Sequence, residues 1–494
     1  MATVWNGLSF MFSEDSYMTL MIILAITVLW LFWSVSSYFR DRNQPPLPPG
    51  NLGFPFIGQT LEYLSALSTA DGLQEWIQKK NDRYGPIFKW RFMGLPMVMM
   101  DQPEGNKYIY QNEGTSHHIF WPFTISTLFG PESLLAQSGD QHKLARRYFN
   151  KFFDHTAMSR YLPAVNRNAI RHFTKYWQGK DELVALDMTN LYTFSTICKL
   201  VLTLEEGPQM DKLLFQLDMW AKGLTSLPIN LPGFQYCKAL KARKLIWEML
   251  DELLEQRRRE LAEDHGSKID ILNNLLTVTD EQGNLLQDSC IKDNLLLLLV
   301  AGFDTSSSVL AMAIYYIAKH PHVYEGIVQE HKMILDKKCA RGRDDESLTM
   351  DDVSAMKYTW RVIKETLRLQ PVTVAGYRKT VTNLEYKGYY IPKDWLLVWN
   401  QFANYNPEHF EDPLKFDPSR WEKPPALYTY VPFGGGSHMC LGYEFAKMEM
   451  LVFIHHLVQH YSWSLLDPNG PIIRDPFPRA FDKTLISVKE IRSF

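Results

Sequence analysis

One cysteine, Cys440, lies in a glycine-rich segment, residues 433–442, with the sequence FGGGSHMCLG. Four of these ten residues are glycine, so the backbone can fold tightly around the sulfur without Cβ clashes. Apolar residues at helical spacing follow, which puts Cys440 near a helix N-terminus, where a thiolate is favoured. No Cys-x-x-Cys partner is present for a zinc or iron–sulfur site, so one axial thiolate bond to a haem iron is favoured. An ordinary turn with a buried cysteine is the alternative.

A second candidate site lies in a long apolar stretch, residues 294–318, which contains the sequence AGFDTS at 301–306. Glycine costs about 1 kcal/mol inside a helix, and Ser and Thr compete for backbone carbonyls. Such residues in mid-helix indicate a functional site. We expect Gly302 to let a ligand lie against the backbone, and Asp304 and Thr305 to pass protons. A kink without chemistry is the alternative. The run 295–300 is short and fits a buried core helix better than a membrane span.

Together these segments resemble the cytochrome P450 family. Four residues stand at matching positions of the family's haem-ligand signature: Phe433, Gly436, Cys440 and Gly442. His438 stands where the family usually has arginine. The resemblance implies a mainly α fold with a small β-rich portion, a haem b whose iron is ligated by Cys440, and a proton route for dioxygen cleavage through Asp304 and Thr305.

The resemblance also assigns a structural triad. Glu365 and Arg368 lie three residues apart, on one helix face, and match the family's Glu-x-x-Arg. Arg420, in the segment FDPSRW at 416–421, matches the arginine that completes the triad. We expect Glu365 to bind Arg420 bidentately and so to fix the loop that leads to Cys440. An exposed ion pair of little energetic value is the alternative.

Haem propionates need cationic or donor partners, and the resemblance assigns four of them: Arg146, Arg378, His438 and His142. His142 occupies the place of the family's tryptophan, one helical turn before Arg146. For Arg378 the alternative is a solvated basic residue on a strand. The other histidines, including His117, His118, His455 and His456, are expected to be surface or core residues.

Composition fits a large folded enzyme. The chain has 494 residues, 46% hydrophobic and 13% aromatic, which is enough for a substantial core. Length alone suggests two or three domains, whereas the resemblance implies one catalytic domain over residues 51–494. The formal net charge of -3 argues against nucleic-acid binding. Five cysteines without repeated spacing indicate free thiols in a reducing compartment.

The N-terminus predicts a membrane anchor. Residues 17–39 form a run of 23 residues without a formal charge, longer than the roughly 20 needed to span a bilayer. Arg40 and Arg42 follow it, so the body should face the cytosol and residues 1–16 the lumen. A proline-rich linker, residues 40–50, then resembles the hinge of membrane-bound family members, which implies the endoplasmic reticulum. A cleaved signal peptide is the alternative.

Helical spacing predicts helices over 72–84, 141–153, 189–203, 237–262, 287–319, 353–369 and 442–461. Short strands are predicted over 87–92, 97–100, 384–386, 389–391 and 396–399. Helices therefore dominate, with a small β-rich portion.

The resemblance places the substrate pocket in four segments, with these candidates: Trp121, Phe123, Leu299, Phe303, Val372, Ala375, Phe477 and Phe481. Most are apolar or aromatic, which favours a bulky apolar substrate, although each could equally be a core residue. The segments 48–58, 356–360 and 432–436 resemble the plant members that oxidise triterpenoids, taxane-type diterpenoids and steroids.

The expected activity is insertion of one oxygen atom of dioxygen into a C–H bond. No Gly-x-Gly-x-x-Gly segment follows a strand, so electrons must come from a separate NADPH-dependent cytochrome reductase. We expect positive charge near Cys440 to dock this reductase, from Lys143, Arg146, Arg147 and Lys447. Ordinary surface cations are the alternative. Two alternatives stay open: a haem-thiolate isomerase or dehydratase, and a non-enzymatic haem sensor or carrier.

Overall fold

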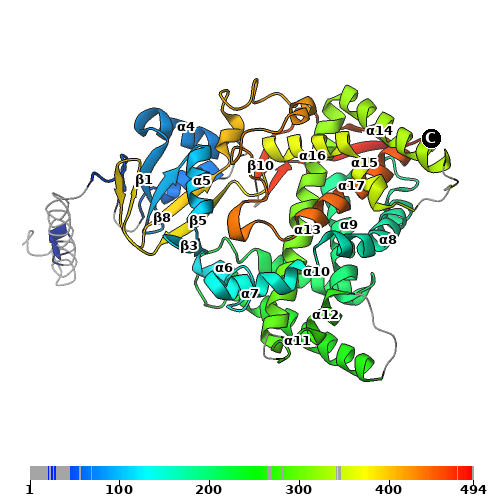
Figure 1. Ribbon diagram of the computed structural model, residues 1–494, viewed down its shortest axis with the longest axis horizontal. Helices are drawn as coiled ribbons and strands as arrows, with labels where there is room; N and C mark the ends of the chain where they lie inside the picture. The colour runs from blue at the N-terminus through cyan, green and yellow to red at the C-terminus, as the bar shows by residue number, and fades with distance from the viewer. Residues whose placement is uncertain are drawn as a thin grey trace, which may run out of the picture.

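The computed structural model describes residues 45–491 except 55–56, 68, 70, 264–269, 280–282, 341, 343–346 and 475–476, together with Met21, Leu24, Ala25, Thr27 and Val28. Figure 1 shows a smaller β-rich portion, built around strands β1, β8, β5 and β3, beside a larger helical portion. The predicted mainly α fold with a small β-rich portion is confirmed.

The helical portion is organised around α13 (Asp288–Lys319), which packs along α9 (Ala185–Leu202). The other α-helices are α3 (Thr60–Leu67), α4 (Gly72–Tyr84), α5 (Pro103–Gln111), α6 (Phe123–Phe129), α7 (Gly139–Asn150), α8 (His155–His172), α10 (Pro208–Ala221), α11 (Gln235–Ala262), α12 (Ile271–Thr277), α14 (Pro321–Ala340), α15 (Met350–Ala355), α16 (Lys357–Leu369) and α17 (Tyr443–His460). A π-helical turn, η1 (Phe173–Trp177), extends α8, and short 3₁₀ turns are η2 (Phe402–Tyr405), η3 (Pro418–Glu422) and η4 (Gly436–His438).

The main sheet has the strand order β1-β2-β8-β5-β3. Its strands are β1 (Ile87–Phe92), β2 (Leu95–Met100), β3 (His117–Phe120), β5 (Ala375–Thr380) and β8 (Leu396–Asn400). Only the β2–β8 pair is parallel in this sheet. The smaller sheets contain β4 (Glu182–Val184), β6 (Leu384–Tyr386), β7 (Tyr389–Ile391), β9 (Tyr461–Leu465), β10 (Ile472–Arg474), β11 (Pro478–Ala480) and β12 (Leu485–Glu490).

The predicted continuous helix over 353–369 is wrong, because the chain breaks at Met356 between α15 and α16. The carboxylate of Glu330, on α14, accepts hydrogen bonds from the backbone N–H groups of Tyr358 and Thr359 at 2.6 and 2.9 Å. These amides lie in the first turn of α16, where they lack partners within the helix. A distant side chain therefore caps a new helix at this position.

The apolar run 295–300 is part of a core helix, as expected. Helix α13 has the length and composition to cross a membrane, yet 61% of its most apolar window is buried inside the protein. The predicted anchor, 17–39, falls almost wholly outside the described residues. Three of the few described there, Met21, Leu24 and Val28, are helical and more than half exposed.

Candidate functional site

The segment around Cys440 is a tight loop between η4 and the start of α17. The Cys440 backbone N–H donates to the Phe433 carbonyl at 2.9 Å and closes the loop. Gly436 has φ 68, and a Cβ there would lie 2.8 Å from the Tyr110 carbonyl oxygen, so this position requires glycine. Gly442 directly precedes α17, and the Phe433 ring meets Tyr443 edge-on with centroids 4.8 Å apart.

Cys440 has accessible surface although protein surrounds it. Burial raises the pKa of its thiol, while a hydrogen bond from the Gly442 backbone N–H and the positive charge of Arg146 lower it. The sulfur is therefore accessible while the surrounding protein desolvates it. The Gly442 N–H and the Arg146 charge both stabilise the thiolate form of Cys440, which is the form that binds a metal.

Arg146, on α7, is tied to the segment that carries the cysteine. Its Nη1 donates to the Met439 carbonyl at 2.6 Å, and its Nε donates to Asn150 Oδ1 at 3.0 Å. The guanidinium therefore lies beside the residue that precedes Cys440 and supplies positive charge there.

The other three expected propionate partners lie near one another. The rings of His142 and His438 stack, with centroids 3.7 Å apart. His438 Nδ1 lies 3.0 Å from Glu113 Oε1, and Arg378 Nε lies 2.7 Å from the same oxygen. Sequence pattern alone does not single out Glu113, because a glutamate after a helix is usually solvated. The fold alone brings it to Arg378.

Helix α13 is buried along most of its length, and this burial is interrupted at 301–305. Ala301 is exposed there, and the next four residues are partly accessible, whereas 306–315 are buried. The Thr305 hydroxyl donates to the Ala301 carbonyl at 2.7 Å. Burial and the negative charge of Asp218 raise the pKa of Asp304 to about 6. The segment thus offers a carboxyl group that both gains and loses a proton near neutral pH.

The expectation that Gly302 lets a ligand lie against the backbone stays a prediction, and the structure gives this glycine a packing role as well. A Cβ at this position would lie 2.7 Å from Cδ1 of Ile197, on α9. The missing side chain therefore allows α13 and α9 to approach each other, which explains the glycine by helix packing.

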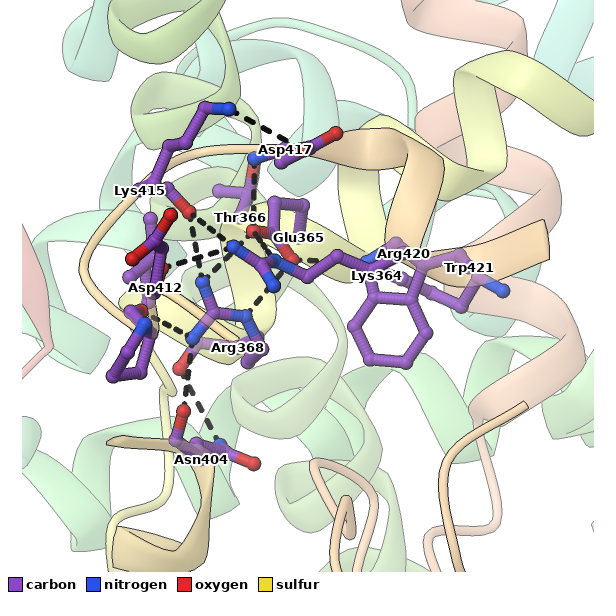
Figure 2. Close-up of polar contacts among 12 residues, drawn as sticks. Lys364, Glu365, Thr366, Arg368, Asn404, Asp412, Lys415, Asp417, Arg420 and Trp421 are labelled. Atoms are coloured by element: carbon purple, nitrogen blue, oxygen red, sulfur yellow. Dashed lines mark hydrogen bonds and ion pairs between the residues drawn. The ribbon is translucent and has the colours of Figure 1, made fainter. Parts of the chain in front are cut away.

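Glu365 is completely buried and accepts hydrogen bonds from four residues, three through their side chains and Asp417 through its backbone N–H (Figure 2). Arg368 makes the bidentate contact, with Nε to Oε2 at 2.9 Å and Nη2 to Oε1 at 2.8 Å. Arg420 gives it a single N–H, Nε to Oε1 at 3.1 Å, and Trp421 Nε1 donates to Oε2 at 3.0 Å. The expectation that Glu365 binds Arg420 bidentately is therefore wrong, because the remaining Arg420 N–H groups bind carbonyls of residues 411, 412 and 415.

The cluster anchors the segment before the cysteine loop. Arg368 Nη1 also donates to the carbonyls of Asn404 and Pro413 at 2.8 and 2.6 Å. The Asp417 backbone N–H donates to Glu365 at 3.0 Å. One buried carboxylate on α16 thus organises residues 404–421 through two arginines.

The pocket candidates differ in burial. Leu299 is completely buried in the main core, so we leave it out of any pocket. Phe123 and Phe481 are each 67% exposed, while the others are partly buried: Trp121, Phe303, Val372, Ala375 and Phe477. Trp121 Nε1 is a buried donor without a hydrogen-bond partner among the described residues.

The residues fit a haem held by one thiolate. Cys440 is accessible, and glycine at 436 allows its loop to fold closely against Tyr110. Arg378 is 4% exposed, and its Nη2 has no hydrogen-bond partner within the described part of the chain. A buried, incompletely bonded guanidinium suits a carboxylate ligand such as a haem propionate.

Comparison with known proteins identifies the family of this chain. The family profile for cytochrome P450 matches residues 48–486. Taxane 13-alpha-hydroxylase of Taxus cuspidata is 36% identical over 464 residues, 92% of this chain and 94% of that protein. Beta-amyrin 28-monooxygenase of Vitis vinifera is 34% identical over 470 residues, 94% of this chain and 97% of that protein.

Among solved structures, retinoic acid-bound cyanobacterial CYP120A1 is similar with a TM-score of 0.80 and 29% identity, covering 91% of this chain and all of that chain. Proteins of this family and fold are haem-thiolate enzymes, with a cysteine-ligated haem iron. The chain belongs to the cytochrome P450 family and is a haem-thiolate monooxygenase.

Proposed function

We propose that this chain is a membrane-anchored monooxygenase that hydroxylates a bulky apolar terpenoid or sterol-like substrate. Dioxygen and electrons from an NADPH-dependent cytochrome reductase are its co-substrates. Relatives that cover over nine-tenths of the chain are named for oxidation of taxanes and beta-amyrin, both polycyclic terpenoids. This naming supports the substrate class.

The observation that carries the proposal is the accessible stretch at 301–305 in the middle of buried α13. A haem bound at Cys440 supplies dioxygen activation. The chain supplies the protons: the Asp304 carboxyl, with a pKa of about 6, takes one from solvent and releases it near neutral pH. Because the Thr305 hydroxyl donates to the Ala301 carbonyl, its oxygen remains available to accept a hydrogen bond.

Apolar residues among the pocket candidates support a bulky apolar substrate. The Phe303 ring packs edge-on against Phe194 with centroids 5.2 Å apart, which fixes its orientation on α13. Val372 and Ala375 lie after α16 and at the start of β5, and both are partly accessible. We assign Trp121, Phe303, Val372 and Ala375 to the substrate pocket, with Phe477 contributed by the C-terminal hairpin.

A patch of exposed apolar residues near the predicted linker supports the membrane location. Its members are Phe54, Ile57, Leu61, Leu64, Met93 and Leu95, with exposures from 39% to 77%. The segment bearing the first four is joined to the β1–β2 turn by the Gly58–Phe92 bridge and by the Met93 N–H to Thr60 Oγ1 bond of 2.7 Å. Exposed apolar patches of this kind suit contact with lipid. We place the anchor at 17–39 and the catalytic domain on the cytosolic face of the endoplasmic reticulum.

Positive charge on the side of the cysteine loop supports reductase docking. Lys143 and Arg147 on α7 are exposed, and Arg146 between them contacts the Met439 carbonyl. Lys447, on α17, lies over the Trp360 ring at 5.7 Å. We propose that this face receives the electron donor, since complementary charge favours the encounter of proteins.

Reconstitution tests the proposal. Membranes containing this protein, a cytochrome reductase and NADPH are supplied with polycyclic diterpenes, triterpenes and sterols, and products are identified by mass spectrometry. We expect a product heavier by one oxygen, absent when NADPH is omitted. Substrate turnover that continues without NADPH and yields an isomer or a dehydrated product would instead identify an isomerase or dehydratase.

A further inference from the structure

Glu113 is a buried carboxylate at the edge of the proposed haem site. It follows α5, and its side chain is 5% exposed. Its Oε1 lies 2.7 Å from Arg378 Nε and 3.0 Å from His438 Nδ1, and its Oε2 accepts a hydrogen bond from Ser437 Oγ at 3.0 Å. One carboxylate therefore joins β5 to the loop that carries Cys440.

Glu113 is ionised at neutral pH. Burial raises its pKa, but the contacts with His438 and Arg378 outweigh burial, and the pKa of Glu113 is lowered to about 2. The Arg378 side chain is itself only 5% exposed. A buried guanidinium without a paired carboxylate carries a large desolvation cost, so the pair is retained only as a unit.

The contacts of Glu113 leave part of Arg378 available. Its Nε faces Glu113, and its Nη1 donates to the Tyr377 carbonyl at 3.0 Å. Nη2 has no hydrogen-bond partner among the described residues, as noted above. Two fixed contacts therefore orient the guanidinium while a third nitrogen remains for a ligand.

His438 is held from several sides, and its Nε2 lies 3.4 Å from the Gln137 carbonyl oxygen. Its Nδ1 edge faces Glu113, and its ring lies against the ring of His142. The imidazole is shorter than the arginine usual at this position in the family. Glu113 and His142 together determine where the smaller side chain lies.

We propose that Glu113 is a positioning residue for the haem, which orients Arg378 and His438 toward the propionates and offsets one positive charge there. The inference rests on the proposed propionate role of these two residues, and it assigns no part of the oxygen chemistry to Glu113. It predicts that loss of the carboxylate weakens haem retention and makes reduction of the iron easier, because an unbalanced positive charge favours the more negative, reduced state.

The test uses purified full-length protein loaded with haem, without reductase or substrate. Two quantities are measured for Glu113→Gln: the rate of haem transfer to excess apomyoglobin, and the midpoint potential of the iron. We expect transfer roughly tenfold faster, from loss of a partner to a buried charge, and a more positive potential. Glu104→Gln, at an exposed glutamate on α5, the helix that precedes Glu113, is the matched control and should change neither.

Glu113→Asp tests the effect of side-chain length while the negative charge is kept. It also serves as the test variant if Glu113→Gln does not fold. The shorter side chain keeps the charge, so we expect faster haem transfer with an unchanged potential. Wild-type transfer rates and potentials in the variants that fold would overturn the inference. Both measurements are independent of turnover, so a failure of the proposed monooxygenase activity is recognised separately.

Discussion

The imidazole rings of His142 and His438 stack with their centroids 3.7 Å apart and their planes 20° apart. His142 comes from α7, and His438 from the turn η4 that precedes Cys440. Burial and the neighbouring charges of His438 and Arg146 lower the pKa of His142 to about 4, so this ring is neutral at pH 7. The contact thus ties α7 to the cysteine loop.

A double-mutant cycle measures this stack. His142→Ala, His438→Ala and the double variant, all loaded with haem, are unfolded with urea. We expect a coupling free energy of about 1 kcal/mol, as for aromatic pairs. His142→Ala combined with His322→Ala, an exposed residue of α14, is the control, and these two should be additive within about 0.5 kcal/mol. Additivity of the stacked pair would show that the contact contributes nothing.

Removing the charge of Glu365 should severely destabilise the fold. Glu365→Gln leaves Arg368, which is completely buried, without its bidentate carboxylate. We expect a loss of about 3 to 5 kcal/mol in the free energy of unfolding, measured with urea. Glu422→Gln breaks only an exposed ion pair with Arg361 and should cost less than about 0.5 kcal/mol. Equal losses in the two variants would contradict the role given to the buried cluster.

Buried histidines should make the fold sensitive to acid. Burial lowers the pKa of His331 to about 3, and burial with the neighbouring charge of His331 lowers the pKa of His455. A histidine whose folded pKa lies below its ordinary value of 6.5 contributes stability that is fully present above pH 6.5. This contribution is lost as the pH falls below 6.5 toward 3.

The expected loss for each such histidine is about 1.4 kcal/mol per pH unit in this window. Asp304 acts in the opposite direction, since its raised pKa of about 6 gives stability that is lost as the pH rises through that value. Urea unfolding at pH 8, 7, 6 and 5 measures the sum of the histidine and Asp304 contributions. His331→Asn should make the unfolding free energy depend less steeply on pH. An unfolding free energy that does not fall between pH 6 and pH 5 would contradict the prediction.

Asp304 should control proton supply rather than folding. Asp304→Asn removes a carboxyl group that titrates near pH 6, and we expect product formation to fall by about a hundredfold. Asp218→Asn removes the neighbouring negative charge, together with an exposed ion pair to Lys222, and should lower the Asp304 pKa while preserving most of the rate. Initial rates of product formation with the reductase and NADPH measure both. An unchanged rate in Asp304→Asn would assign proton supply to another group.

Local pattern predicted much of the fold. The helix at 72–84 and the strands at 87–92, 384–386 and 389–391 have the predicted bounds. These elements carry their own end signals, such as Gly85 after α4. The break at Met356 was missed because its cause, the Glu330 carboxylate on α14, lies far away in the sequence. Helix α8 received no prediction, and it contains Pro163, which ordinarily argues against a helix interior.

The candidate site shows the same limit. Motif spacing brought Glu365, Arg368 and Arg420 together, but only the structure shows that Arg368 takes the bidentate contact. Periodicity could not tell which face of α13 is accessible, so Leu299 was assigned to the pocket although it is a core residue. Glu113 carries no local signal, because its partners come from β5 and the cysteine loop.

Isotope labelling tests the monooxygenase account most directly. The reconstituted enzyme, reductase and NADPH are given a polycyclic terpenoid and dioxygen labelled with oxygen-18. The mass of the product is then measured by mass spectrometry. The account predicts a product carrying one labelled oxygen atom, and no label when only the water is labelled. A product of unchanged elemental composition, or one labelled from water alone, would contradict it.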